Sequence, residues 1–277
     1  MKLRAFLLLV VALVALYFSA AAYVLRFQIA RILFPYIAST GSSGEQVTHR
    51  VIGRSGNIML VRRYGAPHVG CVVFFPGQHG GISSYEKNLF PSYVANGIAV
   101  FALTYPGQDG APGRSELGEV QSLAQQALSF VGVTCPPSKT VFVGRSLGSM
   151  LAAYAASVAH PAGLVLEGAA PSLSSVVLVR LRSRWYLSPI AQLPVSKLLS
   201  HDYSLAEALS PSPTFPVVVF QGTADDQTPI EALRAPGVLP LDSRLVAVPG
   251  GTHSNTYLLA IEPYVQSALR MLRHEQT

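Results

Sequence analysis

Residues 140–148, with the sequence TVFVGRSLG, decide the fold that this chain is expected to adopt. A short apolar run suited to a buried strand leads into the pattern G-x-S-x-G, and a helical pattern over residues 147–159 follows it. A serine at such a tight strand-to-helix turn needs glycine two positions before and after it, because a Cβ atom there would collide. The pattern therefore predicts a nucleophilic hydroxyl on Ser146 and an elbow formed by Gly144 and Gly148. The alternative is a Gly/Ser-rich turn with a structural role alone.

Six further runs of β-branched and aromatic residues flank this stretch. They cover residues 58–62, 69–75, 99–104, 163–167, 217–221 and 244–248, and helical patterns cover residues 118–131, 147–159 and 256–274. The central runs are almost continuously apolar, as parallel strands covered on both faces must be. The sequence therefore predicts an α/β fold in which helices cover both faces of a mostly parallel sheet.

A serine hydroxyl needs a base and an acid to become a nucleophile, and both are expected after later strands. His253 directly follows the last predicted strand and precedes the last helix, so it is the expected base. Asp225 and Asp226 follow the preceding strand, and we prefer Asp225 as the acid. Glu167, at the end of an earlier strand, is a weaker alternative. The order Ser146, Asp225, His253 is the order of an α/β-hydrolase triad.

An acyl-transfer site also needs two N–H donors for the charge that develops on the carbonyl oxygen. The amide of Leu147, directly after the nucleophile, is the first expected donor. The Gly-rich residues 75–81, with the sequence FPGQHGG, suit the second, and Gln78 is the expected residue. His79 is expected to be a loop residue without a catalytic role. The chain carries no phosphate-binding loop, no H-E-x-x-H motif and no Cys/His cluster with zinc spacing, so no cofactor or metal is predicted.

The N-terminus carries the features of a membrane anchor. Residues 5–25 hold no charged side chain and are long enough, at about 1.5 Å per residue, to cross about 30 Å of hydrocarbon. Basic residues flank the run, so residues 1–26 are expected to anchor the chain in the bilayer and to export the rest. The nearly balanced charges leave the orientation weakly determined. The alternative is a cleaved signal peptide that ends at the small residues 19–22.

The remaining sequence divides into a connecting segment and one folded domain. Residues 27–44 form the expected juxtamembrane segment and linker, in which the amphipathic residues 27–37 suit the bilayer surface. Residues 45–277 form the expected catalytic domain. Within it, residues 169–215 join two predicted strands over an unusually long distance and are expected to form a lid or an extra packing helix. The basic stretch from Arg180 to Trp185 suits either acidic lipid headgroups or a solvated face.

Composition and cysteine usage limit the other classes of function. The chain has 277 residues, of which 50% are hydrophobic and 12% charged, and this excludes a disordered or fibrous protein. The net charge is +6, and residues 1–35 contain four basic residues and no acidic residue. The rest therefore shows no basic stripe, and no nucleic-acid partner is predicted. Cys71 lies in an apolar run and Cys135 in a turn, and both are expected to be free thiols, with a disulfide between them as the alternative.

These motifs make the chain resemble the α/β-hydrolase superfamily over about residues 50–273. It is most similar to membrane-anchored, serine aminopeptidase-like hydrolases, a group that includes lysophospholipases and protein depalmitoylases. The resemblance implies the roles of nucleophile, acid and base for Ser146, Asp225 and His253. Pro76 is a departure, because the family often has histidine there. The matching segments are residues 76–78, 105–107, 113–116, 144–148, 164–167, 215–229 and 250–253.

The expected function is that of a membrane-anchored serine hydrolase that cleaves carboxylic esters or thioesters of small or lipid-like acyl substrates. A serine peptidase of the same fold is an alternative, and it would need a carboxylate in the lid to bind a free amino terminus. Asp202 and Glu207 are the only acids there. A membrane scaffold without turnover is the alternative from a different class.

Overall fold

The computed structural model describes residues 2–38, 47–78, 81–209 and 213–274, and they form an eight-stranded sheet in the order β1-β2-β4-β3-β5-β6-β7-β8. The pairs β1–β2 and β2–β4 are antiparallel and all other pairs are parallel. This confirms the predicted α/β-hydrolase fold class with its mostly parallel sheet. The strands are β1 (Val47–Ile52), β2 (Ile58–Tyr64), β3 (Gly70–Phe75), β4 (Ile98–Thr104), β5 (Thr140–Arg145), β6 (Gly163–Glu167), β7 (Val217–Gly222) and β8 (Arg244–Val248).

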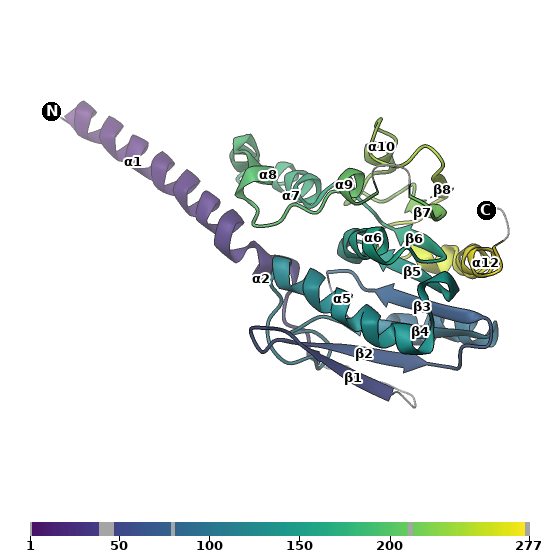
Figure 1. The fold of residues 1–277 in the computed structure, drawn as a ribbon. Coiled ribbons are helices and arrows are strands. Elements are labelled where there is room, and N and C mark those ends of the chain that lie inside the picture. The colour runs from purple at the N-terminus through teal and green to yellow at the C-terminus, as the bar shows by residue number, and fades with distance from the viewer. Residues whose placement is uncertain (1, 39–46, 79–80, 210–212, 275–277) are drawn as a thin grey trace.

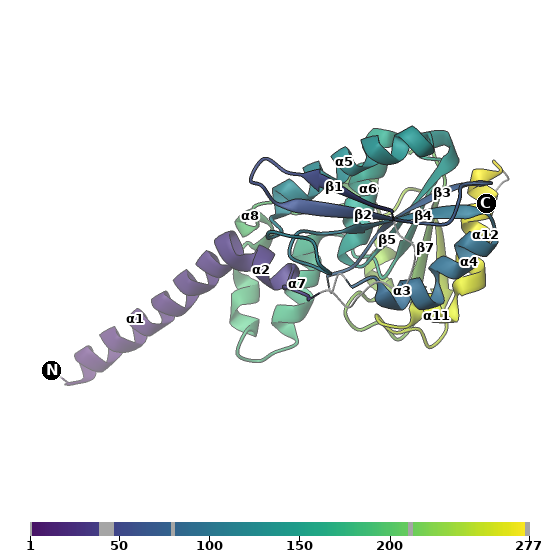
Figure 2. The same cartoon turned by 90° about the horizontal axis from the view of Figure 1, so that it is seen from below.

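Helices cover both faces of the sheet (Figures 1 and 2). One face carries α5 (Leu117–Thr134) and α6 (Leu147–Ala159), and the other carries α3 (Ser83–Asn88), α4 (Phe90–Ala95), α11 (Thr256–Leu259) and α12 (Ile261–Leu272). The alternation of side chains along each strand builds these two cores. In β3, for example, Val73 and Phe75 belong to the core under α5 and α6, whereas Val72 and Phe74 belong to the opposite one.

The structure adds one strand to the seven predicted ones and divides one predicted helix. Strand β1 lies at the edge of the sheet and pairs only with β2 among the described strands. Its sequence VTHRVI mixes polar and apolar residues, because an edge strand needs less apolar surface than a central one. The predicted helix over residues 256–274 divides at Ala260 into α11 and α12.

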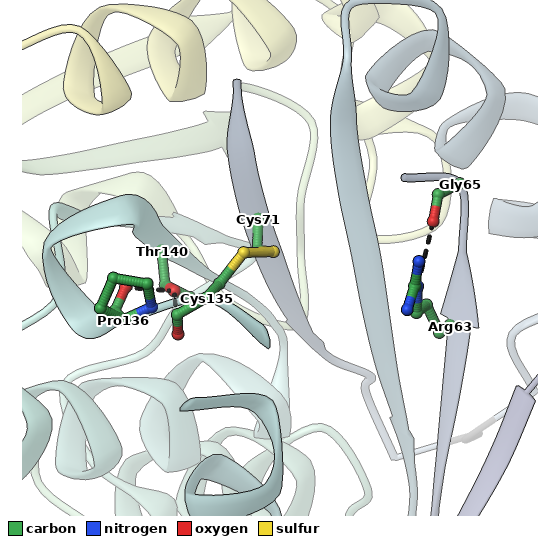
Figure 3. The surroundings of a disulfide bond; sticks show 6 residues. All are labelled: Arg63, Gly65, Cys71, Cys135, Pro136 and Thr140. Atoms are coloured by element: carbon green, nitrogen blue, oxygen red, sulfur yellow. Dashed lines mark hydrogen bonds between the residues drawn. A yellow bond between two sulfur atoms is a disulfide. The ribbon is translucent and has the colours of Figure 1, made fainter. Parts of the chain in front are cut away.

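The two cysteines form a disulfide bond, so the prediction of two free thiols is wrong. Cys71 lies in β3, and Cys135 follows the last turn of α5, just before β5. Parallel pairing sets Cys71 opposite Thr140 of β5, whose hydroxyl donates to the carbonyl oxygen of Pro136 at 2.9 Å. The Cα atoms of the two cysteines are therefore 6.2 Å apart although 64 positions separate them in the sequence (Figure 3).

The N-terminal segment is a long helix that projects from the domain (Figure 1). It consists of α1 (Lys2–Tyr23), a π-helical turn (Val24–Gln28) and α2 (Ile29–Leu33). Among the described residues, the helix Lys2–Leu33 alone is both long and apolar enough to cross a membrane, with a mean hydropathy of 2.5. The linker at residues 40–44 lies outside the described residues.

Part of the juxtamembrane segment packs against the domain. Ile29, Leu33 and Phe34 are buried in the core on the α5 and α6 side of the sheet. The ring of Phe34 contacts that of Tyr105 at a centroid distance of 5.6 Å. These three side chains therefore face protein, whereas Phe27, Ile32 and Tyr36 are exposed, and the contact of residues 27–37 with a bilayer surface stays a prediction.

The long connection between β6 and β7 contains several short helices above the sheet (Figure 1). They are α7 (Leu173–Arg182), a 3₁₀ turn (Ser188–Gln192), α8 (Val195–Leu198) and α9 (Leu205–Leu209). We call residues 169–209 the lid segment. Ser172 caps the first of these helices, since its hydroxyl accepts from the amide of Ser175 at 3.1 Å.

Candidate active site

Ser146 lies at a strained turn between β5 and α6. Its backbone angles are φ 52° and ψ −121°, in a region that residues other than glycine rarely adopt. A Cβ atom at Gly144 would lie 2.6 Å from the carbonyl oxygen of Gly148, and one at Gly148 would lie 2.1 Å from the carbonyl oxygen of Phe75. Only glycine therefore fits on either side of the serine.

The structure brings Ser146, His253 and Asp225 into one hydrogen-bonded chain. The Oγ atom of Ser146 lies 2.8 Å from Nε2 of His253, and Nδ1 of His253 lies 2.8 Å from Oδ2 of Asp225. The three residues follow the ends of β5, β8 and β7, which meet at the same edge of the parallel sheet. Asp226, in contrast, is exposed.

Asp225 is held in its ionised form by donors that surround it. Its Oδ1 atom accepts from the amides of Gln227 at 3.0 Å and Thr228 at 2.9 Å, and its Oδ2 atom accepts from the Thr228 hydroxyl at 2.8 Å. Burial alone would raise the pKa of Asp225, but the bonds from His253 and Thr228 outweigh it and hold the pKa below its ordinary value. An ionised Asp225 accepts a hydrogen bond from Nδ1–H of His253, which leaves Nε2 free to accept a hydrogen bond from Ser146.

Sequence reasoning did not find Thr228, although its spacing offered a signal. A threonine three positions after an aspartate at the end of a strand suits a turn in which the carboxylate accepts backbone and hydroxyl donors. The Thr228 hydroxyl also lies 3.3 Å from Nδ1 of His253. It therefore contacts both partners of the acid–base pair.

Glu167, the alternative acid, lies next to the site without contacting the His253 ring. Its carbonyl oxygen accepts from the amide of Ser146 at 2.8 Å, and its carboxylate accepts from the amide of Tyr257 at 3.1 Å. The carboxylate forms an ion pair with Arg145 at 3.5 Å, and Arg145 also donates to the carbonyl oxygen of His253. Burial raises the pKa of Glu167, and the guanidinium opposes this rise. The pair thus connects the backbones that carry the serine and the histidine.

Leu147 and Gln78 lie together with Ser146 around a small pocket of about 20 Å³. Leu147 is the first residue of α6, so its amide has no acceptor within the helix. The side chain of Gln78 donates to the carbonyl oxygen of Ile32 at 2.7 Å, and the Gln78 carbonyl oxygen accepts from Gln108 at 2.8 Å. Both bonds fix the position of Gln78 beside the serine. His79 lies outside the described residues.

The two acids considered for a peptidase have other partners. The carboxylate of Asp202 accepts from the amide of Ser174 at 2.7 Å, and that of Glu207 accepts from the hydroxyl of Tyr154 at 3.0 Å. Within the described part of the chain, no group of three or more His, Cys, Asp or Glu side chains could hold a metal ion.

The sequence model of the alpha/beta hydrolase family matches residues 72–266, which include all three residues of the hydrogen-bonded chain. This protein belongs to the alpha/beta hydrolase family. It is 32% identical over 196 residues to an uncharacterized protein of Mycobacterium tuberculosis, and the match covers 69% of this chain but only 65% of the relative. The family assignment therefore rests on residues 72–266.

Solved structures share the fold at low sequence identity. An esterase from Pyrococcus furiosus has a TM-score of 0.65 at 12% identity, with 88% of this chain and all of that chain covered. A monoacylglycerol lipase from Paleococcus ferrophilus has a TM-score of 0.56 at 19% identity, with 78% of this alpha/beta hydrolase and 99% of the lipase covered. At such identities the likeness concerns the fold alone.

Proposed function

We propose that this protein is a membrane-anchored serine hydrolase that cleaves carboxylic esters or thioesters of acyl substrates. The observation that carries the proposal is the chain of two 2.8 Å contacts from Ser146 through His253 to Asp225. The strained turn at Ser146 adds support, because such strain persists where it presents a reactive group.

The reaction follows from this arrangement. Nε2 of His253 takes the proton of Ser146 while Oγ attacks the substrate carbonyl carbon, and Asp225 stabilises the imidazolium. The amides of Leu147 and Gln78 donate to the oxyanion. The tetrahedral intermediate then collapses, the alcohol or thiol leaves with the proton from His253, and an acyl-enzyme remains. His253 next takes a proton from water, whose oxygen attacks the acyl carbon to form a second tetrahedral intermediate. Its collapse breaks the bond from the acyl carbon to Oγ of Ser146, His253 returns the proton to Oγ, and the carboxylic acid leaves.

Acyl esters fit better than peptides as substrates. The pocket beside Ser146 includes the apolar side chains of Leu33, Met150 and Leu173. A peptidase needs a carboxylate for the free amino terminus, and Asp202 and Glu207 are bonded elsewhere. The printed activities of the structural relatives, an esterase and a monoacylglycerol lipase, point in the same direction.

We propose further that residues 5–25 anchor the enzyme in the bilayer and that the catalytic domain is exported. The apolar helix Lys2–Leu33 supports the anchor. The disulfide between Cys71 and Cys135 supports the export, because such bonds persist in oxidising compartments.

Labelling with a fluorophosphonate, which reacts with activated serines, tests the mechanism. We expect the wild type to be labelled and to hydrolyse p-nitrophenyl acetate, and Ser146→Ala to lose labelling and about 10⁴-fold or more of the turnover. Ser157→Ala is the matched control, because Ser157 lies on the same helix and donates to a backbone carbonyl away from the site. A folded wild type that is not labelled, or labelling that survives in Ser146→Ala, would contradict the proposal.

A further inference from the structure

A cavity of about 370 Å³ lies between the N-terminal helix and the lid segment. The helix contributes one wall and the lid segment the other, and almost all of the lining is apolar. Its lining includes Ala20 and Leu33 from the helix and Val176 and Leu181 from the lid segment. We call this space the anchor–lid cavity.

The inner end of the anchor–lid cavity reaches the candidate active site. Leu33, Gln78 and Val176 line both this cavity and the small pocket that contains Ser146. Gln78 is bonded to the carbonyl oxygen of Ile32 and holds the end of the helix beside the serine. A linear apolar group that fills the cavity can therefore have its terminal carbonyl near Ser146.

The outer end lies where the bilayer must be. The hydroxyl of Tyr17 donates to the carbonyl oxygen of Tyr186 at 2.5 Å, so the lid segment contacts the helix from Tyr17 onward. Residues 2–16 are exposed throughout, and at about 1.5 Å per residue they span about 22 Å, which is less than the hydrocarbon thickness of about 30 Å. If the helix spans the membrane, Tyr17 and the tip of the lid segment that it contacts therefore reach the bilayer.

The side chains at this tip suit that position. Trp185 is 86% exposed next to Tyr186, and Arg182 and Arg184, which precede it in the sequence, are exposed as well. Tryptophan and tyrosine are enriched at membrane interfaces, and arginines there face anionic headgroups. At the bilayer interface, lipid would cover the apolar surface of Trp185.

We propose that the anchor–lid cavity binds the acyl chain of a membrane amphiphile, which enters from the bilayer and places its ester or thioester carbonyl at Ser146. This inference rests on the proposed hydrolase function and names its substrate class. The N-terminal helix then has two roles, because it holds the enzyme in the membrane and forms one wall of the acyl site. The acyl chain of the substrate passes from the lipid into the cavity without crossing water, so little of its apolar surface is exposed on the way.

Two matched pairs of variants test the cavity in the full-length protein. Ala20→Phe fills it from the helix, and Ala22→Phe changes a residue of the same helix that does not line it. Val176→Phe narrows it from α7, and Val179→Phe is the corresponding control on that helix. The measured quantity is the ratio of kcat/KM for p-nitrophenyl palmitate to that for p-nitrophenyl acetate, in mixed micelles.

We expect the wild type to prefer the palmitate ester, and Ala20→Phe and Val176→Phe to lower the ratio at least about tenfold, since each excludes methylene groups from an apolar site. Acetate turnover and fluorophosphonate labelling should persist in Ala20→Phe, and both controls should keep the wild-type ratio. An equal fall in Ala20→Phe and Ala22→Phe, or a wild type without chain-length preference, would overturn the inference while leaving the serine mechanism intact.

A binding measurement separates the cavity from the chemistry. Ser146→Ala is mixed with a palmitoyl ester that carries a diazirine on its chain, irradiated and digested, and the crosslinked peptides are identified by mass spectrometry. Crosslinks within residues 20–33 and 176–190 are expected, and crosslinks confined to other segments would overturn the inference. This result does not depend on turnover, so it stands even if the wild type is not labelled by fluorophosphonate.

Discussion

At the scale of single residues, the ionised state of Asp225 organises the candidate site. Gln221, Gln227 and Thr228 donate to its carboxylate, which also lies 2.8 Å from Nδ1 of His253. The tautomer of His253, and with it the ability to accept from Ser146, depends on that carboxylate. Changes at Asp225 should therefore affect both turnover and stability.

We expect Asp225→Asn to lower the free energy of unfolding by about 1–3 kcal/mol at pH 7, because a charged acceptor loses its bonds. The native pKa of Asp225 is below its ordinary value, so its stabilising effect is complete above about pH 3.9 and is lost as the pH falls through the native pKa. The difference between the wild type and the variant should persist from pH 7 to about pH 4 and shrink below it.

Thermal unfolding in detergent at pH 3, 5 and 7 measures this difference. Asp226→Asn is the control, because Asp226 is an exposed neighbour of the same type and should leave stability unchanged. A difference that grows as the pH falls, or an equal effect of the two variants, would show that Asp225 is not held ionised by its partners.

At the scale of elements, the close approach of α6 to the end of β3 positions the nucleophile. A Cβ atom at Gly148 would lie 2.1 Å from the carbonyl oxygen of Phe75 and 2.3 Å from that of Pro76. Those carbonyls belong to the backbone that leads to Gln78. The same contact therefore sets the separation between Ser146 and the second expected oxyanion donor.

Gly148→Ala should force β3 and α6 apart, because backbone atoms cannot yield as a flexible side chain can. We expect a loss of about 2 kcal/mol or more in the free energy of unfolding, and a loss of turnover in whatever fraction folds. The measurements are thermal unfolding and fluorophosphonate labelling of the folded fraction.

Gly132→Ala is the matched control within helix α5. A Cβ atom there meets nothing within 4 Å, so alanine should stabilise that helix by about 0.5–1 kcal/mol. If Gly148→Ala were as stable and active as the wild type, the contact between α6 and the end of β3 would not be needed to position Ser146.

At the scale of the whole molecule, the N-terminal helix, the lid segment and the sheet are connected. Ile29 and Leu33 of the helix join the same core as Leu173 and Val177 of the lid segment. The disulfide joins β3 to the end of α5 within the domain. The C-terminal part of the helix is therefore packed against the domain, so the orientation of the proposed anchor would determine the compartment of the domain.

We expect Cys71 and Cys135 to be oxidised in cells, because the proposed export exposes them to an oxidising compartment. Cells that express the full-length protein are quenched in acid, and free thiols are alkylated with a polyethylene-glycol maleimide before and after reduction. A shift in mobility should appear only after reduction, and a Cys71→Ala/Cys135→Ala variant should show none. Two reactive thiols before reduction would place the domain in a reducing compartment.

The local patterns of the sequence were sufficient to predict much of this protein. The G-x-S-x-G turn, the apolar strands and the order of the candidate residues are each encoded by neighbouring positions or by regular spacing, and seven strands lie where those patterns indicate. The apolar run at residues 5–25 likewise predicts a helix from composition alone. Backbone sterics and the burial of apolar side chains act over such short distances, so they can be read from the chain.

Contacts between distant segments were decided only by the tertiary structure. The contact of Asp225 with His253 joins residues that follow different strands, and the disulfide depends on a register between β3 and β5. The burial of Ile29 and the cavity between helix and lid segment also require surfaces that are far apart in the sequence. Complementary shape and pairing register are properties of the folded chain, and no spacing of residues along the sequence specifies them.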